Sequence, residues 1–191
     1  MTDTTRAVGQ HWTANVTLRR GVAVVAGALL VAVGAQISVP LPGTPVPLTF
    51  QVPAALVVGG LLGRRLGAAS LVLYLVLGAA GLPVFAPIGL PGFARLIGPT
   101  GGYLLALPLA AAVMGLACQG ERSIVKLAVG LVSGLAVIYA GGVAQLAILD
   151  GDLAIAWRIG SLPFLAGDAV KLLLAGLIVG RLRAPMQRAL H

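Results

Sequence analysis

Residues 21–63 read GVAVVAGALLVAVGAQISVPLPGTPVPLTFQVPAALVVGGLLG and contain no charged side chain. A helix that crosses a bilayer needs about 20 mostly apolar residues, and this stretch is roughly twice that length. Its middle is interrupted by Pro40, Pro42, Gly43, Pro45 and Pro47. Clustered prolines and glycine break a helix and favour a loop. The stretch therefore predicts two membrane spans joined by a loop.

The apolar pattern continues along the rest of the chain. We predict six spans, at residues 22–39, 48–62, 66–82, 100–118, 127–149 and 162–180, of which the second is short for a full crossing. The expected fold class is an all-α integral membrane protein with six transmembrane helices and an outward-facing binding pocket. It forms a single membrane domain, which we divide into an N-terminal cytoplasmic segment (1–20), a helix bundle (22–182) and a cytoplasmic tail (183–191).

An alternative for the first span is a secretory signal peptide, with Arg19 and Arg20 as its basic region. The length of the apolar stretch and the five spans that follow it favour a membrane helix instead.

The composition excludes several classes of protein. Of the 191 residues, 59% are hydrophobic and only 9% are charged, whereas soluble domains carry about 25% charged residues. A soluble enzyme and a disordered chain are therefore excluded, and the single cysteine excludes an intramolecular disulfide. The net charge of +8 does not indicate nucleic acid, because the basic residues are scattered between apolar runs.

The basic residues predict the orientation in the membrane. If the N-terminus is cytoplasmic, ten of the 13 fall in inside segments: Arg6, Arg19, Arg20, Arg64, Arg65, Arg122, Lys126, Arg181, Arg183 and Arg188. Only Arg95 and Arg158 fall in outside loops. Because cytoplasmic loops carry an excess of Lys and Arg, both termini are predicted to be cytoplasmic.

Two charged residues lie inside the sixth span. Asp168 and Lys171 are three residues apart, so they share one face of a helix. Charges within a membrane are costly and usually mark a functional site that faces the bundle interior. The plainer alternative is an ion pair that only orients the helix. Both residues fall in the outer half of the span, so a pocket there would open to the outside.

Further polar residues map to the same outer half. They are Thr49 and Gln51 at the start of the second span, Tyr103 early in the fourth and Gln145 late in the fifth. The long loop at 83–99 carries Arg95 and is too apolar for a free linker, so we expect it to pack over the bundle as a lid. Together these residues predict one polar cavity on the outer side.

Enzymatic function is not expected. Both histidines, His11 and His191, are at the ends of the chain, and there is no HExxH motif, nucleotide-binding motif or second intramembrane carboxylate. We therefore expect no catalytic residues, no metal site and no cofactor. Active transport would need energy from a partner or from an ion gradient.

Four motifs, in order along nearly the whole chain, carry a family resemblance. They are Val46-Pro47-Leu48-Thr49-Phe50-Gln51, Gly81-Leu82-Pro83-Val84-Phe85-Ala86, Gly98-Pro99-Thr100-Gly101-Gly102-Tyr103-Leu104, and Gly167-Asp168 followed by Lys171. This pattern resembles the BioY family, the biotin-specific substrate-capture (S) components of energy-coupling factor (ECF) transporters.

The resemblance implies a non-enzymatic subunit for high-affinity biotin capture in a vitamin uptake system. It implies a multi-pass protein of the inner (plasma) membrane that works with a transmembrane coupling subunit and cytoplasmic ABC-type ATPases. It also implies docking on the coupling subunit through a small-residue face of the first helix, which Ala28 and Ala32 fit. From the residues alone, such small residues are expected to pack the bundle internally.

The chemistry of the expected site residues agrees with biotin. Asp168 can accept hydrogen bonds from the ureido N–H groups, and Lys171 can donate to the ureido carbonyl. Arg95 suits the tail carboxylate through a charge-assisted pair. Phe85 and Tyr103 are expected to contact the rings, and Thr49, Gln51 and Gln145 complete the expected substrate-binding set.

Three alternatives stay open at this point. The chain could capture another vitamin, although a 5% aromatic content argues against ligands that need stacking. It could be a self-sufficient secondary transporter that needs no ATPase. It could also be a purely structural membrane subunit, which the intramembrane Asp168 and Lys171 disfavour.

Overall fold

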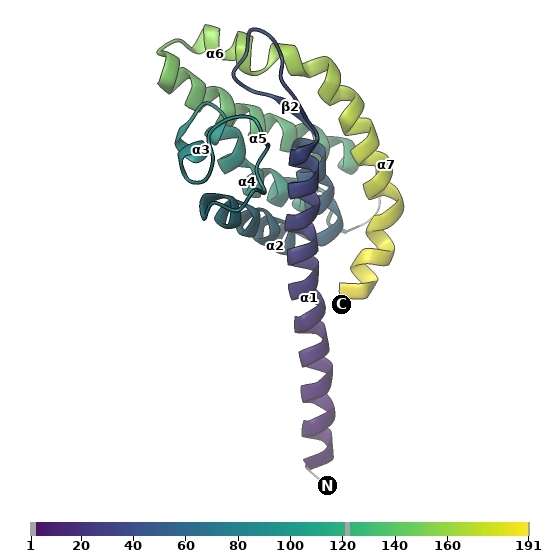
Figure 1. Ribbon diagram of the computed structural model, residues 1–191. Coiled ribbons are helices and arrows are strands. Elements are labelled where there is room, and N and C mark those ends of the chain that lie inside the picture. The colour runs from purple at the N-terminus through teal and green to yellow at the C-terminus, as the bar shows by residue number, and fades with distance from the viewer. Residues whose placement is uncertain (1–2, 121–122, 191) are drawn as a thin grey trace.

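Figure 1 shows the computed structural model, which describes residues 3–120 and 123–190, with side chains from residue 16 onward. Its elements are α1 (Asp3–Gln36), β1 (Ser38–Val39), β2 (Leu48–Thr49), α2 (Gln51–Ala79), α3 (Ala94–Ile97), α4 (Gly101–Ala117), α5 (Ile124–Asp150), α6 (Leu153–Gly160), the 3-10 helix η1 (Leu162–Phe164) and α7 (Leu165–Leu190). The fold is a helical bundle, as predicted, with one two-stranded ribbon.

Four helical stretches in the described part of the chain are long and apolar enough to cross a membrane. They are Val16–Gln36, Gln51–Ala79, Ile124–Asp150 and Leu153–Leu190, and Gly101–Ala117 is a shorter apolar helix. The class of integral membrane protein is therefore confirmed. The number of six crossings stays a prediction.

Most of the predicted second and third spans, at 48–62 and 66–82, falls within α2, which is interrupted at Gly63. This residue has φ +80° and ψ 175°, a conformation that glycine adopts readily and other residues do not. A Cβ atom placed on Gly67 would lie 2.8 Å from the Cα atom of Gly59. Eight residues of straight helix span about 12 Å, so the chain reverses at Gly63 and the two arms of α2 pack against each other.

Close backbone contact holds the helices together. A Cβ atom placed on Gly59 of α2 would lie 2.7 Å from the Cα atom of Ala111 in α4. One placed on Gly141 of α5 would lie 2.7 Å from the carbonyl oxygen of Gly102 in α4. Helices in lipid associate by this kind of approach, because burial of apolar surface gives little driving force there.

The small residues of α1 also allow close packing between helices. This corrects the expectation that Ala28 and Ala32 form an exposed docking surface. Ala28 is 2% and Ala32 is 9% exposed, and both belong to the main hydrophobic core. A Cβ atom placed on the adjacent Gly27 would touch Ser70 and Val58 of α2. The expected docking surface on Ala28 and Ala32 is therefore not exposed, because this face of α1 packs on α2. The exposed residues of α1 are larger aliphatics, including Val22, Val25, Leu29 and Val33.

The proline-rich segment after α1 folds back over the bundle. Ser38 pairs with Thr49 and Val39 with Leu48 in the antiparallel ribbon β1–β2. Val46, in the loop between these strands, is buried in a second apolar cluster with Tyr139 and Phe164. The uncharged loop predicted at 40–47 is thus part of the packed structure.

The C-terminal part of the chain differs from the prediction in its boundaries. The expected sixth span at 162–180 is observed as η1 followed by α7, and α6 precedes them. The expected tail at 183–191 is not a separate segment, since α7 continues to Leu190. Pro185 lies inside this helix without ending it.

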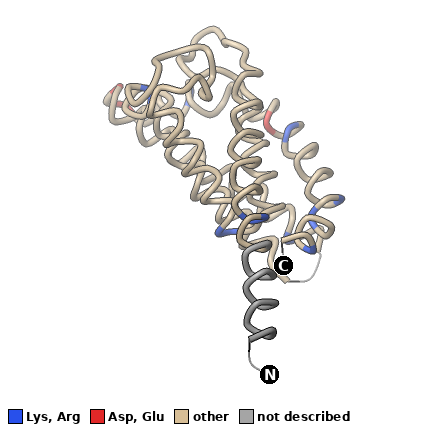
Figure 2. The backbone as a smooth tube through the Cα atoms, turned by 60° about the horizontal axis from the view of Figure 1, so that its bottom comes forward, with Lys and Arg blue, Asp and Glu red and all other residues tan. Residues whose placement is uncertain are grey.

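Charges are unevenly distributed along the bundle. Figure 2 shows most Lys and Arg segments at the end where the C-terminus lies, and the acidic segments toward the other end. This is the separation on which the predicted orientation rests.

We predict that Gly59→Ala destabilises the protein, because the new methyl group would meet the α4 backbone at Ala111. Overpacking of this kind costs about 1–3 kcal/mol, and the melting temperature in detergent measures it. Gly21→Ala is the matched control, since nothing lies within 4 Å of a Cβ atom there. Equal melting temperatures for the two variants would contradict the packing described for α2 and α4.

Candidate functional site

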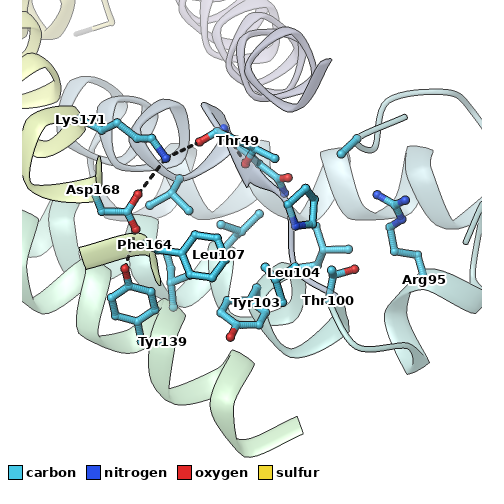
Figure 3. A pocket seen from close by; sticks show the side chains of 16 residues that line it. Thr49, Arg95, Thr100, Tyr103, Leu104, Leu107, Tyr139, Phe164, Asp168 and Lys171 are labelled. Atoms are coloured by element: carbon cyan, nitrogen blue, oxygen red, sulfur yellow. Dashed lines mark hydrogen bonds and ion pairs between the residues drawn. The ribbon is translucent and has the colours of Figure 1, made fainter. Parts of the chain in front are cut away.

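A cavity lies at the end of the bundle where the ribbon, the α3 loop and η1 meet the helices (Figure 3). Its volume is about 60 Å³. Its lining residues are Val46, Pro47, Thr49, Gln51, Val52, Ala86, Arg95, Thr100, Tyr103, Leu104, Leu107, Ile138, Tyr139, Phe164, Asp168 and Lys171. The lining is mostly apolar and includes three charged side chains.

An ion pair forms one end of this cavity. The Lys171 ammonium lies 2.9 Å from Oδ1 of Asp168, one turn away on α7. The Tyr139 hydroxyl, from α5, donates to Oδ2 of Asp168 at 2.6 Å. Lys171 also donates to the backbone carbonyl of Thr49, in β2, at 2.9 Å. The pair therefore links α7 to α5 and to the ribbon.

Burial makes these extra partners necessary. Asp168 is 3% and Lys171 is 6% exposed. Attraction between two buried charges offsets their desolvation only when further hydrogen bonds satisfy the remaining polar atoms. Tyr139 and Thr49 supply such bonds, and the Lys171 ammonium also lies 5.9 Å from the centroid of the Phe50 ring.

Arg95 lies at the other end of the cavity in Figure 3, away from the ion pair. It sits on α3 and is only 4% exposed. Its Nε atom donates to the Leu90 carbonyl at 2.7 Å, and its Nη2 atom donates to the Ile88 carbonyl. The guanidinium carbon also lies 6.0 Å from the centroid of the Phe85 ring. Its hydrogen-bond partners in the structure are thus carbonyls of its own loop.

Arg95 keeps its positive charge in this setting. Burial lowers the pKa of the guanidinium, and the neighbouring Tyr74 opposes that shift. The ordinary pKa of arginine is so high that the group stays protonated at physiological pH. Within the described side chains, the ion pair of Lys171 with Asp168 accounts for one cation of the cavity, and no carboxylate pairs with Arg95. The cavity therefore carries one uncompensated positive charge.

The structure brings together six of the eight substrate-binding residues expected from the sequence. These are Asp168, Lys171, Arg95, Gln51, Tyr103 and Thr49, all of which line the cavity. Thr49 faces Lys171 with its backbone carbonyl. Tyr103 donates its hydroxyl to the Gly160 carbonyl at 2.7 Å, so α4 is also joined to α6.

Phe85 and Gln145, the other two expected residues, do not line the cavity in this structure, and their contact with a ligand stays a prediction. The Phe85 ring packs edge-on against Tyr74, with centroids 5.4 Å apart. The Gln145 amide donates to the carbonyls of Leu96 at 3.1 Å and Gly98 at 2.7 Å. Both residues hold the loop that carries Arg95, because packing and backbone satisfaction draw them away from the cavity.

Gln36 holds another part of the same loop. Its amide nitrogen donates to the carbonyls of Phe85 at 3.0 Å and Pro83 at 3.3 Å. Gln36 at the end of α1 and Gln145 on α5 therefore attach the loop to two different helices. This agrees with the expectation of a loop packed over the bundle.

The sequence analysis missed several lining residues. Tyr139 is the most important of them, because it donates to Asp168. A tyrosine inside an apolar span carries a hydroxyl that needs a hydrogen-bond partner, and this signal could have identified Tyr139. The others are Val46, Pro47, Val52, Ala86, Thr100, Leu104, Leu107, Ile138 and Phe164. Of these, only Val46, Pro47, Ala86, Thr100 and Leu104 lie in the motifs that carry the family resemblance.

This arrangement can recognise a small amphipathic ligand. One end offers a carboxylate and an ammonium, the middle is apolar, and the other end offers an uncompensated guanidinium. No group of three potential metal-ligating side chains occurs within residues that the structure describes. A cavity that carries charged side chains among membrane helices is typical of substrate-binding proteins of transport systems.

Comparison with known proteins gives the family. The BioY family model matches residues 7–188, so the chain belongs to the BioY family. A relative from Thermotoga maritima, named biotin transporter BioY, is 42% identical over 154 residues, which cover 81% of this chain and 89% of the relative. A probable biotin transporter BioY from Pyrococcus horikoshii is 44% identical and covers 81% of this chain and 90% of the relative.

A solved structure has the same fold. The chain superposes on the crystal structure of the S-component for biotin from an ECF-type ABC transporter with a TM-score of 0.76. The sequences are 25% identical, and the match covers 96% of this chain and 94% of the other. The expected resemblance and the class of all-α integral membrane protein are confirmed, whereas the count of six transmembrane helices and the outward-facing pocket stay predictions.

We predict that the charges of Asp168 and Lys171 are strongly coupled. Asp168→Asn leaves a buried ammonium and Lys171→Met leaves a buried carboxylate, so each single change destabilises the protein, by about 3–5 kcal/mol for a broken buried pair in soluble proteins. The double variant should lose much less than the sum of the two. Unfolding of the four proteins without added ligand measures this cycle, and additive losses would contradict a buried ion pair.

Proposed function

We propose that this chain is the biotin-binding subunit of an ECF-type transporter and takes up biotin from outside the cell. The observation that carries the proposal is the charge pattern of the cavity, with a compensated ion pair at one end and an uncompensated Arg95 at the other. Biotin has a neutral ureido ring at one end and a carboxylate at the other. The family and the relatives named biotin transporters support the same ligand.

The ureido ring binds at the ion pair in this proposal. Asp168 accepts from the ureido N–H groups, and Lys171 donates to the ureido carbonyl. The ligand carboxylate is kept away from Asp168 by charge repulsion. It pairs instead with Arg95, while Gln51, Thr49 and Tyr103 line the space between the two ends. Binding itself uses no cofactor.

Binding requires the cavity to open. Its volume of about 60 Å³ is less than half of the roughly 150 Å³ that accommodates benzene in an engineered protein cavity. Biotin is larger than benzene, so part of the lining must move when it enters. Two parts of the lining lie outside the long helices: the loop held by Gln36 and Gln145, and the β1–β2 loop. These are the parts that we expect to move.

The chain has a transport role and lies in a membrane. We propose that it works with two kinds of partner. A transmembrane coupling subunit and cytoplasmic ABC-type ATPases supply the energy for release of biotin to the inside. The protein lies in the inner (plasma) membrane with both termini in the cytoplasm. The concentration of basic segments at one end of the bundle supports this orientation (Figure 2).

We predict that Arg95→Gln weakens biotin binding to the purified protein about 10- to 100-fold, the value of a hydrogen bond to a charged group. The variant should also lose the preference for biotin over biotin amide, because Arg95 is the residue that pairs with the carboxylate. Asp168→Asn should weaken both ligands equally. Arg158→Gln, which removes an exposed cation of α6, is the control and should bind like the parent protein.

Titration calorimetry of the four proteins with both ligands measures these effects. A full preference for biotin over the amide in Arg95→Gln would contradict the assignment of the carboxylate. A lost preference in Asp168→Asn instead would reverse the orientation of the ligand.

Uptake tests the proposed partners separately. Cells that contain this chain together with the coupling subunit and ATPases should accumulate labelled biotin. The ATPases are needed because the chain has no nucleotide-binding motif. Cells that contain the chain alone should bind biotin without accumulating it. Accumulation without the ATPases would overturn the partners and leave biotin binding intact.

A further inference from the structure

A second cavity lies at the basic end of the bundle. Its volume is about 420 Å³, and it shares no lining residue with the cavity described above. The lining residues are Arg20, Leu62, Gly63, Arg64, Arg65, Leu66, Gly115, Gln119, Gln187 and Leu190. They come from α1, the turn of α2, the end of α4 and the end of α7, so four helices meet around it.

The chemistry of this lining is cationic. Arg20, Arg64 and Arg65 contribute three guanidinium groups, and Gln119 and Gln187 contribute two amides. No acidic side chain is found among the lining residues within the described ranges 16–120 and 123–190. An acceptor of several hydrogen bonds with negative charge is the complementary ligand, and arginine matches the oxygens of a phosphate group especially well.

The cavity also lies at one boundary of the long uncharged stretch of the chain. Arg20 directly precedes the uncharged stretch that begins at Gly21, and Arg64 and Arg65 directly follow its end at Gly63. These arginines therefore mark one boundary of the apolar bundle, at its positively charged end. Leu62, Leu66 and Leu190 add apolar surface beside them. Basic pockets between helices on the cytoplasmic side suit the head groups of anionic lipids.

We propose that this cavity binds the phosphate group of an anionic phospholipid and thereby connects α1, the turn of α2 and the end of α7. A long hydrogen bond from Nε of Arg20 to the Leu190 carbonyl, at 3.3 Å, joins α1 to α7 here. A phosphate bound between the arginines adds further links. A free phosphate ion shares this chemistry, so the test includes both sources.

The test uses the full chain in a neutral detergent and measures lipid binding by native mass spectrometry and by the shift in melting temperature. The probes are phosphatidylglycerol, phosphatidylcholine and inorganic phosphate. Phosphatidylglycerol should bind and stabilise, phosphatidylcholine should bind more weakly, and phosphate alone should have little effect. Arg20→Gln and Arg64→Gln should each weaken phosphatidylglycerol about fivefold, as expected for one basic residue near a charged membrane surface.

Two controls make the result specific. Arg158→Gln removes one positive charge at a site that does not line the cavity and should bind phosphatidylglycerol like the parent protein. Arg64→Lys keeps the charge and loses only the paired donors of the guanidinium, so its affinity should lie between those of the parent and Arg64→Gln, and this partial rescue shows that the loss in Arg64→Gln does not come from misfolding. Equal lipid affinity of Arg64→Gln and Arg158→Gln would overturn the site. An arginine-dependent shift with inorganic phosphate as large as that with lipid would overturn the lipid assignment.

Discussion

The buried pair of Asp168 and Lys171 constrains the end of the molecule where the first cavity lies. Neither charge can be buried among apolar helices unless its remaining polar atoms have partners. Tyr139 on α5 and the carbonyl of Thr49 in the ribbon are those partners. The hydrogen bonds of this ion pair thus hold α7 against α5 and the proline-rich ribbon over the cavity.

A second constraint places Arg95 opposite this pair. The loop from the end of α2 to α4 is attached at one point by Gln36 and at another by Gln145. Within the loop, the carbonyls of Leu90 and Ile88 hold the guanidinium. The result is a cavity with a compensated pair at one end and a free positive charge at the other, which distinguishes the two ends of an amphipathic carboxylate. The proposed recognition of biotin and its proposed orientation rest on this separation of charges.

Much of this arrangement could be predicted from the sequence, because a membrane restricts the structures that a chain can adopt within it. Long apolar runs indicate helices, and Asp168 and Lys171 stand out as charges within such a run. The distribution of basic residues predicts an orientation for the same reason. These signals are local in the sequence and do not depend on tertiary packing.

The features that could not be predicted depend on which face of a helix meets which neighbour. Ala28 and Ala32 form a small-residue face, and only the packing of α1 on α2 shows that the bundle itself covers it. Gln145 is directed to loop carbonyls and Phe85 to Tyr74, although their sequence positions suit the cavity equally well. Tyr139 lies 29 residues from Asp168, so their hydrogen bond depends on how α5 packs beside α7.

An experimental structure of the protein with biotin bound tests the central claim most directly, because density for the ligand distinguishes its bicyclic ring from its tail. The account predicts the ureido ring within hydrogen-bond distance of Asp168 and Lys171 and the carboxylate at Arg95. A carboxylate located beside Lys171 with the ring at Arg95, or biotin bound outside this cavity, would contradict it.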